Sequence, residues 1–220
     1  MKTPLDSTNE TPPAPDRRAR RRQETIAEIL AIAEDVMTEE GVNSLSLAEV
    51  ARRLGVQPPS LYKYFQSLMA VYDELFARGM AEHLAVMRAA TDGVAPGLAS
   101  LTATLEASGQ WALANRATAQ LLFWRPVPNF TPSAEAMTTS IAMVDLQRAI
   151  LHDAVAAGEL GPEAERDDQA LFVVSMLING ALTQAMANEP ELAWGEGRFT
   201  PWFPRLMELL PAAFPPASGS

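Results

Sequence analysis

Two short helical patterns joined by a link of about four residues constrain this sequence more than any other feature. Ser46 stands three residues before Glu49, which is the spacing of a capping box at a helix N-terminus. The next apolar residues share one helical face and precede Gly55, a helix stop; they are Leu47, Val50, Ala51 and Leu54. Two prolines push the residue before each of them out of the helical region, so the second helix is predicted to begin near Pro59. A helix-turn-helix over about residues 46–65 follows.

The second helix of this pair is predicted to expose a polar, aromatic and basic face. Leu61, Tyr64 and Phe65 share one side at helical spacing, which leaves three other side chains pointing elsewhere: Ser60, Tyr62 and Lys63. Lysine and hydroxyl groups can bond base edges and phosphates in the major groove, where such a helix docks. Spacing alone also fits a plain helical hairpin whose tyrosines cover a core.

Positive charge is concentrated next to this motif. The 220-residue chain has a net charge of −10, so its total charge does not favour nucleic acid. Residues 17–66 nevertheless carry eight of the 17 basic residues, five of them between Arg17 and Arg22. This run lies just before an amphipathic helix that starts near Ile26 and stops at Gly41, and it is interpreted as a basic arm that can lie along phosphates. A solvated run of charge at a helix start is the alternative.

The run from Leu45 to Phe65, LSLAEVARRLGVQPPSLYKYF, resembles the DNA-binding signature of tetracycline-repressor (TetR) type regulators. The resemblance covers roughly residues 20–80. It implies an all-α homodimer, with an N-terminal three-helix helix-turn-helix domain followed by a helical domain that binds an effector and dimerises. We therefore expect four segments: a leader over 1–16, a DNA-binding domain over 17–66, an effector and dimerisation domain over 67–212, and a tail over 213–220.

The resemblance also implies a set of DNA-binding residues. Ser46 matches a phosphate contact, Tyr62 and Tyr64 match an aromatic pair on the DNA backbone, and Lys63 matches a base-reading position. The other matching positions approach base edges or precede the first helix: Gln57, Pro58, Ser60, Arg20, Arg21 and Arg22. The sequence departs from the family at Leu68, where a phosphate-binding lysine is common. Ser67 is then expected to cap the helix that follows.

The rest of the chain continues the helical pattern, and its aromatic and methionine residues are candidates for an effector pocket. A loop with three prolines, residues 125–132, is expected to act as a lid. The candidate ligand-binding residues are Trp111, Phe123, Trp124, Phe130, Met143, Phe172, Met176 and Asn179. Tryptophan and methionine are also common core residues, so an ordinary core is the competing interpretation.

Two long helices, expected at about residues 133–157 and 164–187, are the candidate dimer interface. Their apolar residues are Met137, Ile141, Val144, Ile150, Leu151, Leu171, Val174, Met176, Leu177, Ile178 and Leu182. By family resemblance the last long helices pair across a two-fold axis. The same residues would also suit a core within one chain.

Composition and motifs argue against several other classes of protein. The chain has no cysteine and two histidines, and it contains no phosphate-loop, nucleophile-elbow or metalloprotease motif. We therefore predict no enzyme, cofactor or metal site. No apolar stretch reaches the length of a membrane span, and a cytoplasmic protein is expected.

The leading hypothesis is a homodimeric repressor that a small-molecule effector releases from a near-palindromic operator in double-stranded DNA. The alternative is a helical dimeric adaptor or ligand sensor without sequence-specific DNA binding.

Overall fold

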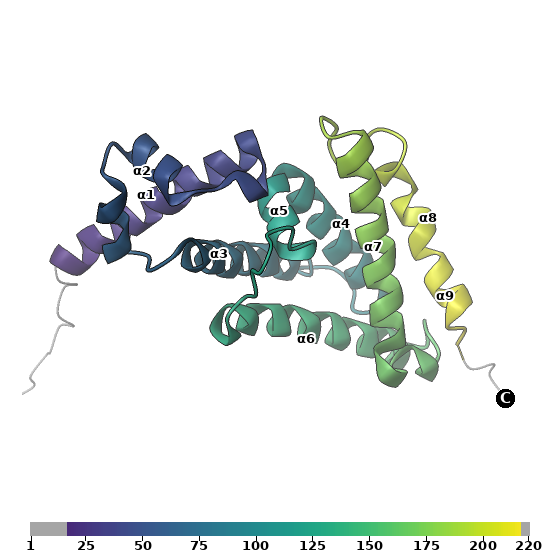
Figure 1. Cartoon of the computed structure of the whole chain (residues 1–220). Helices are drawn as coiled ribbons and strands as arrows, with labels where there is room; N and C mark the ends of the chain where they lie inside the picture. Colours follow the sequence, from purple (N-terminus) through teal and green to yellow (C-terminus); the bar gives the residue numbers. More distant parts are fainter. Residues whose placement is uncertain (1–16, 217–220) are drawn as a thin grey trace, which may run out of the picture.

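A computed structural model describes residues 17–216, which form helices and connecting loops with no strand in that range (Figure 1). The all-α class is confirmed. The elements in chain order are α1 (Arg17–Glu40), η1 (Val42–Ser44), α2 (Leu47–Leu54), η2 (Pro58–Lys63), α3 (Leu68–Ala89), α4 (Leu98–Ala114), α5 (Arg116–Phe123), α6 (Ala134–Ala156), η3 (Pro162–Ala164), η4 (Arg166–Asp168), α7 (Gln169–Asn188), η5 (Thr200–Trp202), α8 (Phe203–Met207) and α9 (Leu209–Ala213), where η denotes a 3₁₀ helix.

The N-terminal elements α1, α2 and η2 form a small helical head around a shared apolar core. Leu30, Val50 and Leu61, one from each element, are almost completely buried. Helix α1 stops where predicted, because Gly41 adopts a positive φ of 94° that few other residues tolerate. The same helix already includes Arg17, so the basic run of residues 17–22 forms the first turns of α1 and does not precede the helix as expected.

Helix α3 belongs to the head at one end and to the C-terminal body at the other. Tyr72 donates a buried hydrogen bond to the carbonyl of Val42 at 2.6 Å, which fastens α3 to the turn after α1. Further along, α3 packs against α4, α5 and α6, as Figure 1 shows. Gly79 permits the approach of α5, since a Cβ there would lie 2.5 Å from the Thr118 Cγ2 atom. One continuous helix therefore joins the two parts of the chain.

Helices α6 and α7 are each positioned by a side chain from another element. The carboxylate of Asp73 on α3 accepts hydrogen bonds from the backbone N–H and the hydroxyl of Ser133, both at 2.7 Å, at the start of α6. Arg148 on α6 donates to both carboxylate oxygens of Asp168, at 2.9 and 2.7 Å, just before α7. Because Asp168 and its neighbour Asp167 have positive φ, α7 begins only at Gln169 instead of near residue 164.

The C-terminal residues cover the side of α7 away from α4 (Figure 1). The single short helix expected over 202–210 is instead divided into η5, α8 and α9, and its Phe203, Met207 and Leu210 are buried.

Within the part of the chain that the structure describes, the segment Arg166–Asn188 is long and apolar enough to cross a membrane by length and composition alone. Seven residues of α7 are buried, and the helix packs against α4, α6 and the C-terminal helices.

Candidate nucleic-acid interface and effector cavity

Helix α2 has the boundaries that the sequence predicts, and its two ends show why. The Ser46 hydroxyl oxygen accepts a hydrogen bond from the backbone N–H of Glu49 at 3.2 Å, which satisfies a free donor of the first turn. Gly55 closes the helix in the left-handed region at φ 73°. The Ser46 hydroxyl still has its own proton to donate, so capping the helix and bonding a phosphate are compatible roles.

A cluster of ion pairs, which the sequence did not predict, fixes α2 against the end of α1. Arg53 donates to Glu49 on α2 and to Glu39 and Glu40 on α1, at 2.7 to 2.8 Å. Hydrogen bonds from Arg52 and then from Arg53 lower the pKa of Glu49 to about 2. Glu49 therefore remains charged at any physiological pH, and the guanidinium of Arg53 is engaged within the protein.

The second element of the motif, η2, is a six-residue 3₁₀ helix that starts at Pro58, whereas the sequence predicted a helix from Pro59. Prolines at 58 and 59 have no backbone N–H, and the N–H of Ser60 bonds the carbonyl of Gln57 three residues back at 2.9 Å. A second short bond runs from the N–H of Tyr64 to the carbonyl of Leu61 at 2.8 Å. The motif is thus a helix, a turn and a tightly wound second segment.

Two buried residues anchor η2 and turn its polar side chains outward. Leu61 and Phe65 lie in the core of the head, as their spacing predicted, while Tyr64 is half-buried. Tyr62 is 56% exposed, and Lys63 and Gln57 are also exposed. Pro58 and Ser60 are half-buried. Of the predicted residues of the turn and of η2, the structure therefore leaves Gln57, Tyr62 and Lys63 exposed to solvent.

The three arginines of the predicted DNA-binding set occupy different environments. Arg20 and Arg21 are exposed on the first turns of α1. Arg22 instead reaches η2, where it donates to the carbonyl of Lys63 at 2.9 Å and its guanidinium carbon lies 5.4 Å from the ring centre of Tyr64. Lys63 Nζ approaches the same ring at 5.1 Å. Arg22 is therefore placed to hold the end of η2, which the sequence alone did not indicate.

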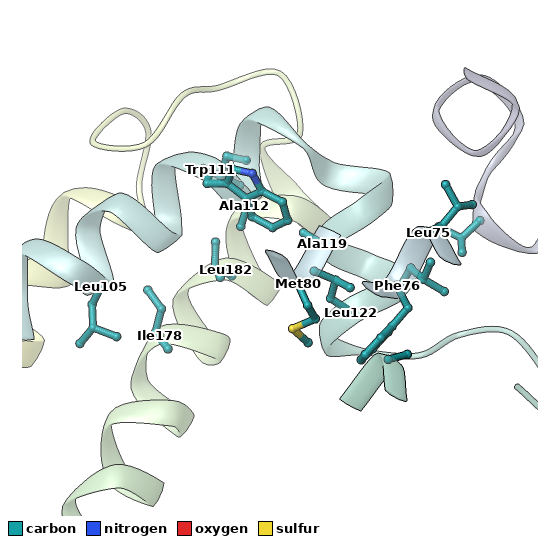
Figure 2. Packing of buried hydrophobic residues seen from close by; sticks show 14 of the residues in the cluster. Leu75, Phe76, Met80, Leu105, Trp111, Ala112, Ala119, Leu122, Ile178 and Leu182 are labelled. Carbon is teal, nitrogen blue, oxygen red and sulfur yellow. The ribbon is translucent and has the colours of Figure 1, made fainter. Parts of the chain in front are cut away.

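A small cavity of about 90 Å³ lies in the C-terminal body, where α3, α4, α5, α6 and α7 converge. Its apolar lining includes Leu105 of α4 and Ile178 and Leu182 of α7, which Figure 2 shows close together in the core. Its polar lining comes from different helices and consists of His83, Ser108, Gln147, Ser175 and Asn179. No lining residue is Asp, Glu, Lys or Arg.

His83 and Ser108 are the two polar residues of this cavity whose side chains are buried. The His83 side chain is only 2% exposed, and its Nε2 atom lies 2.8 Å from the hydroxyl oxygen of Ser108. The Nδ1 atom is buried and has no hydrogen-bond partner. The rings of Trp111 and Phe123 flank the imidazole, with centroids at 4.8 and 5.3 Å. Burial lowers the pKa of His83 to about 4, so the ring is neutral at pH 7.

The eight predicted ligand-binding residues do not form one site. Phe123, Met143 and Asn179 line the 90 Å³ cavity, and Trp111 stacks behind His83. Trp124 lines a separate open pocket of about 250 Å³, where its indole donates to Thr183 at 3.1 Å. Phe130 packs on Tyr72 and Phe76 in the core, so the proline-rich loop does not form a lid over the cavity.

The other two predicted pocket residues, Phe172 and Met176, point away from the cavity. They are 59% and 67% exposed and lie one turn apart on α7. Ile141 of α6 is also exposed, whereas most apolar residues proposed for the dimer interface are buried within the chain: Ile150, Leu151, Leu171, Val174, Ile178 and Leu182. Helical spacing could not separate the inner face from the outer face, because both faces of these helices are apolar.

The largest of the open grooves within residues 17–216 lies away from this cavity and is charged. This groove, of about 660 Å³ between α1 and the α4–α5 corner, has charged groups of both signs, among them Glu34 and Arg116. Burial, and then the charge of Glu82, raises the pKa of Glu34. Across residues 17–216, no three His, Asp or Glu side chains converge in a way that could hold a metal ion.

Comparison with known proteins agrees with this geometry. Residues 29–75 match the family model for bacterial regulatory proteins of the tetR family. Over 54 residues the chain is 39% identical to an uncharacterized HTH-type transcriptional regulator, YobS, of Bacillus subtilis (strain 168), and over 55 residues it is 38% identical to tetracycline repressor protein class A from transposon 1721 of Escherichia coli. These alignments span 24% and 25% of this chain, and 28% and 26% of those proteins.

The resemblance in fold extends much further along the chain. A solved structure of a protein with unknown function from Rhodococcus sp. RHA1 superposes with a TM-score of 0.71 over 86% of this chain and 94% of that chain, at 24% identity. The head and the C-terminal body are therefore arranged as in that protein. The segment that matches the family model includes α2, η2 and the start of α3, so the part of the chain that carries the helix-turn-helix is similar to that of the tetR family of bacterial regulatory proteins.

Proposed function

We propose that this protein is a homodimeric transcriptional repressor in the cytoplasm, with no enzymatic activity, that binds a near-palindromic operator and leaves it when a small effector enters the C-terminal body. The observation that carries the proposal is the geometry of η2. Leu61 and Phe65 fix this segment in the core, and Tyr62 and Lys63 consequently project outward beside Gln57. A lysine and a tyrosine on an exposed face can hydrogen-bond base edges and phosphates in a major groove.

A second copy of the chain is the proposed partner at α6 and α7. Phe172 and Met176 share one face of α7, and Gly180 continues that face one turn further with open space beside its Cα. Exposed aromatic and methionine side chains at helical spacing are typical of a surface that a partner helix covers. A two-fold axis through this surface would present two copies of η2 to successive major grooves, about 34 Å apart.

Helix α5 offers a route by which the cavity can influence the head. Phe123, at its C-terminal end, lines the cavity and touches the His83 ring, and the same helix packs against α1 and η1. Gly79 and Thr118 hold α5 against α3 without spare room. An effector that displaces Phe123 would move α5 as a unit, and the two reading segments would change their spacing. The coupling of effector and operator binding is expected to be about 1–3 kcal/mol and reciprocal.

The proposal is tested by fluorescence anisotropy of the full chain on the DNA that flanks its own gene, at two salt concentrations and against random competitor DNA. Wild-type protein should bind a palindromic segment, with an affinity that falls steeply with salt. Lys63→Ala and Tyr62→Phe should each weaken operator binding, Lys63→Ala by about 1–3 kcal/mol, without altering dimerisation. Arg205→Ala, which removes an exposed charge on α8, is the matched control.

Two outcomes of this experiment would count against the proposal. Equal binding by wild type, Lys63→Ala and Tyr62→Phe would mean that η2 does not face DNA. An equal loss with Arg205→Ala would mean that only net charge matters. Arg22→Ala distinguishes a residue that positions η2 from one that only contacts phosphate. Because Arg22 holds the end of η2, its loss should reduce operator binding more than binding to random DNA. Arg21→Ala, by contrast, should weaken operator binding and random-DNA binding equally.

A further inference from the structure

The open groove of about 660 Å³ lies where the head meets the C-terminal body. Glu34 and Asp35 of α1 line one wall, and Arg116 and Thr118 at the start of α5 line the other. Its volume falls within the roughly 300–1,000 Å³ that small-molecule sites occupy. None of its lining residues lines the cavity at His83, so the groove is a separate place for a ligand.

The wall formed by α1 carries negative charge that the protein does not neutralise. Glu34 is half-buried and Asp35 is exposed, and neither forms an ion pair with another residue of 17–216. The positive charge of Arg78 acts on Glu34, but Arg78 is itself paired with Glu74 at 3.0 Å. Burial, and then the charge of Glu82, raises the pKa of Glu34 because no close cation stabilises its carboxylate. An ammonium group in the groove would supply that cation.

Arg116 is the only basic residue among those that line the groove, and it has no carboxylate partner within residues 17–216. One Nη atom donates to the carbonyl of Leu192 at 3.3 Å, and its Nε atom is buried without a hydrogen-bond partner. A guanidinium has five N–H donors and can bind a carboxylate with two of them. Arg116, Leu113 and Ala114 also line an adjoining hollow of about 410 Å³, so Arg116 lies where the two hollows meet.

The opposite charges of the groove do not satisfy one another. Arg116 forms no ion pair with Glu34 or Asp35, although all three line the same groove. The other lining residues are uncharged and include the apolar side chains of Met37 and Leu113. A bound molecule with a single charge would pair with one wall and leave the other unpaired. A molecule with a positive and a negative group can pair with both.

We propose that this groove binds a small zwitterion, whose ammonium group pairs with Glu34 and Asp35 on α1 and whose carboxylate pairs with Arg116 on α5. Because α1 belongs to the head and α5 to the body, the bound molecule joins the two parts of the chain. The site goes beyond the proposed function, since it needs neither an operator nor the effector cavity. Charge pairs in an open groove are screened by salt, so binding should weaken as ionic strength rises.

The test is a series of ¹H–¹⁵N spectra of the full chain, titrated with ω-amino acids from glycine to 6-aminohexanoate. Chain length in this series sets the distance between the two charges. The backbone amides of Ala117 and Thr118 should shift, whereas those of Ser108 and Asn179, which line the cavity and not the groove, should not. The zwitterion that binds best should bind about tenfold more tightly than the amine and the carboxylate of the same length, such as hexylamine and hexanoate.

Variants assign each charge of the ligand to its wall. Arg116→Gln should abolish the preference for the zwitterion over the amine, and the double variant Glu34→Gln, Asp35→Asn should abolish the preference over the carboxylate. The control is the exposed ion pair at α8: Arg205→Gln and Glu208→Gln should leave both preferences unchanged. If a groove variant does not fold, the comparison of the three ligands on wild-type protein still decides the question.

Three results would overturn the inference. They are equal binding of a zwitterion and its matched amine or carboxylate, no shift at Ala117 and Thr118 with any member of the series, and shifts confined to the cavity residues. The titration contains no DNA, so its outcome is independent of operator binding. A chain that binds no operator but prefers the zwitterion would refute the repressor and retain the groove as a ligand site.

Discussion

Acidification should destabilise this protein through His83 in particular. In the folded state burial lowers the pKa of His83 to about 4, whereas an unfolded chain has a histidine pKa near 6.5. Between these two values the unfolded state binds a proton that the folded state does not. Stability therefore falls as the pH is lowered from about 6.5 to about 4, and it stops falling on this account below pH 4. The full loss is about 3 kcal/mol, at about 1.4 kcal/mol per pH unit.

The assay is urea unfolding, followed by circular dichroism at a fixed protein concentration, at pH 7 and at pH 4.5. Between these pH values the linkage relation gives a loss of about 2 kcal/mol from His83 alone. With an m value of roughly 2–3 kcal/mol per molar for a chain of this size, the midpoint should move by about 1 M urea. Carboxylates also titrate in this interval, although Glu49, whose pKa is about 2, stays charged throughout.

His83→Phe isolates the histidine contribution, because it keeps a ring between Trp111 and Phe123 but cannot take up a proton. The pH-dependent loss in wild type should exceed that in His83→Phe by about 2 kcal/mol. The exposed residue provides the control: His152→Phe should behave like wild type. If wild type and His83→Phe lose the same stability between pH 7 and 4.5, His83 is not held neutral in the core and the description of the cavity is incorrect.

Three further predictions concern the fold and the interfaces. Ser46→Ala removes the N-cap of α2 and should lower the free energy of unfolding by about 1 kcal/mol; Ser46→Asp, which restores a capping oxygen, should recover most of it, and no change on Ser46→Ala would contradict the capping role. Gly79→Ala should cost about 1–3 kcal/mol because its Cβ meets the methyl group of Thr118, and Thr118→Ser, which removes that methyl group, should rescue it in the double variant; a stabilising Gly79→Ala would show that α3 and α5 are not so close. Met176→Asp should convert a dimer to a monomer in light scattering, whereas Leu209→Asp, at another exposed apolar position, should not; monomeric wild type or dimeric Met176→Asp would exclude α7 as the interface.

Local sequence signals placed most helix ends correctly. Gly41 and Gly55 stop α1 and α2, and Ser46 and Ser67 cap α2 and α3, as predicted. These signals work because a capping hydroxyl bonds an N–H three residues away and a glycine adopts a positive φ without help from distant residues. They did not predict the 3₁₀ winding of η2, although the two adjacent prolines explain it afterwards.

The roles of the candidate DNA-binding and ligand-binding residues remain predictions, and the structure shows only where their side chains lie. Gln57, Tyr62 and Lys63 are exposed in and beside η2, and three of the eight predicted pocket residues line the 90 Å³ cavity. The contact of Arg22 with η2 depends on Lys63 and Tyr64, which are about forty residues away in the chain. His83 was assigned no role beforehand, because a lone histidine on a helix carries no signal of burial.

The amino-acid sequence thus determined which segments are helical, where most of them end, and which family model residues 29–75 match, because these properties depend on residues within a few positions of one another. The tertiary structure decided which face of α6 and α7 lies inside, whether Phe172 and Met176 meet a ligand or solvent, and which nitrogen of His83 is left without a partner. Those outcomes depend on burial against segments distant in the sequence, and an apolar pattern on both sides of a helix is compatible with either choice.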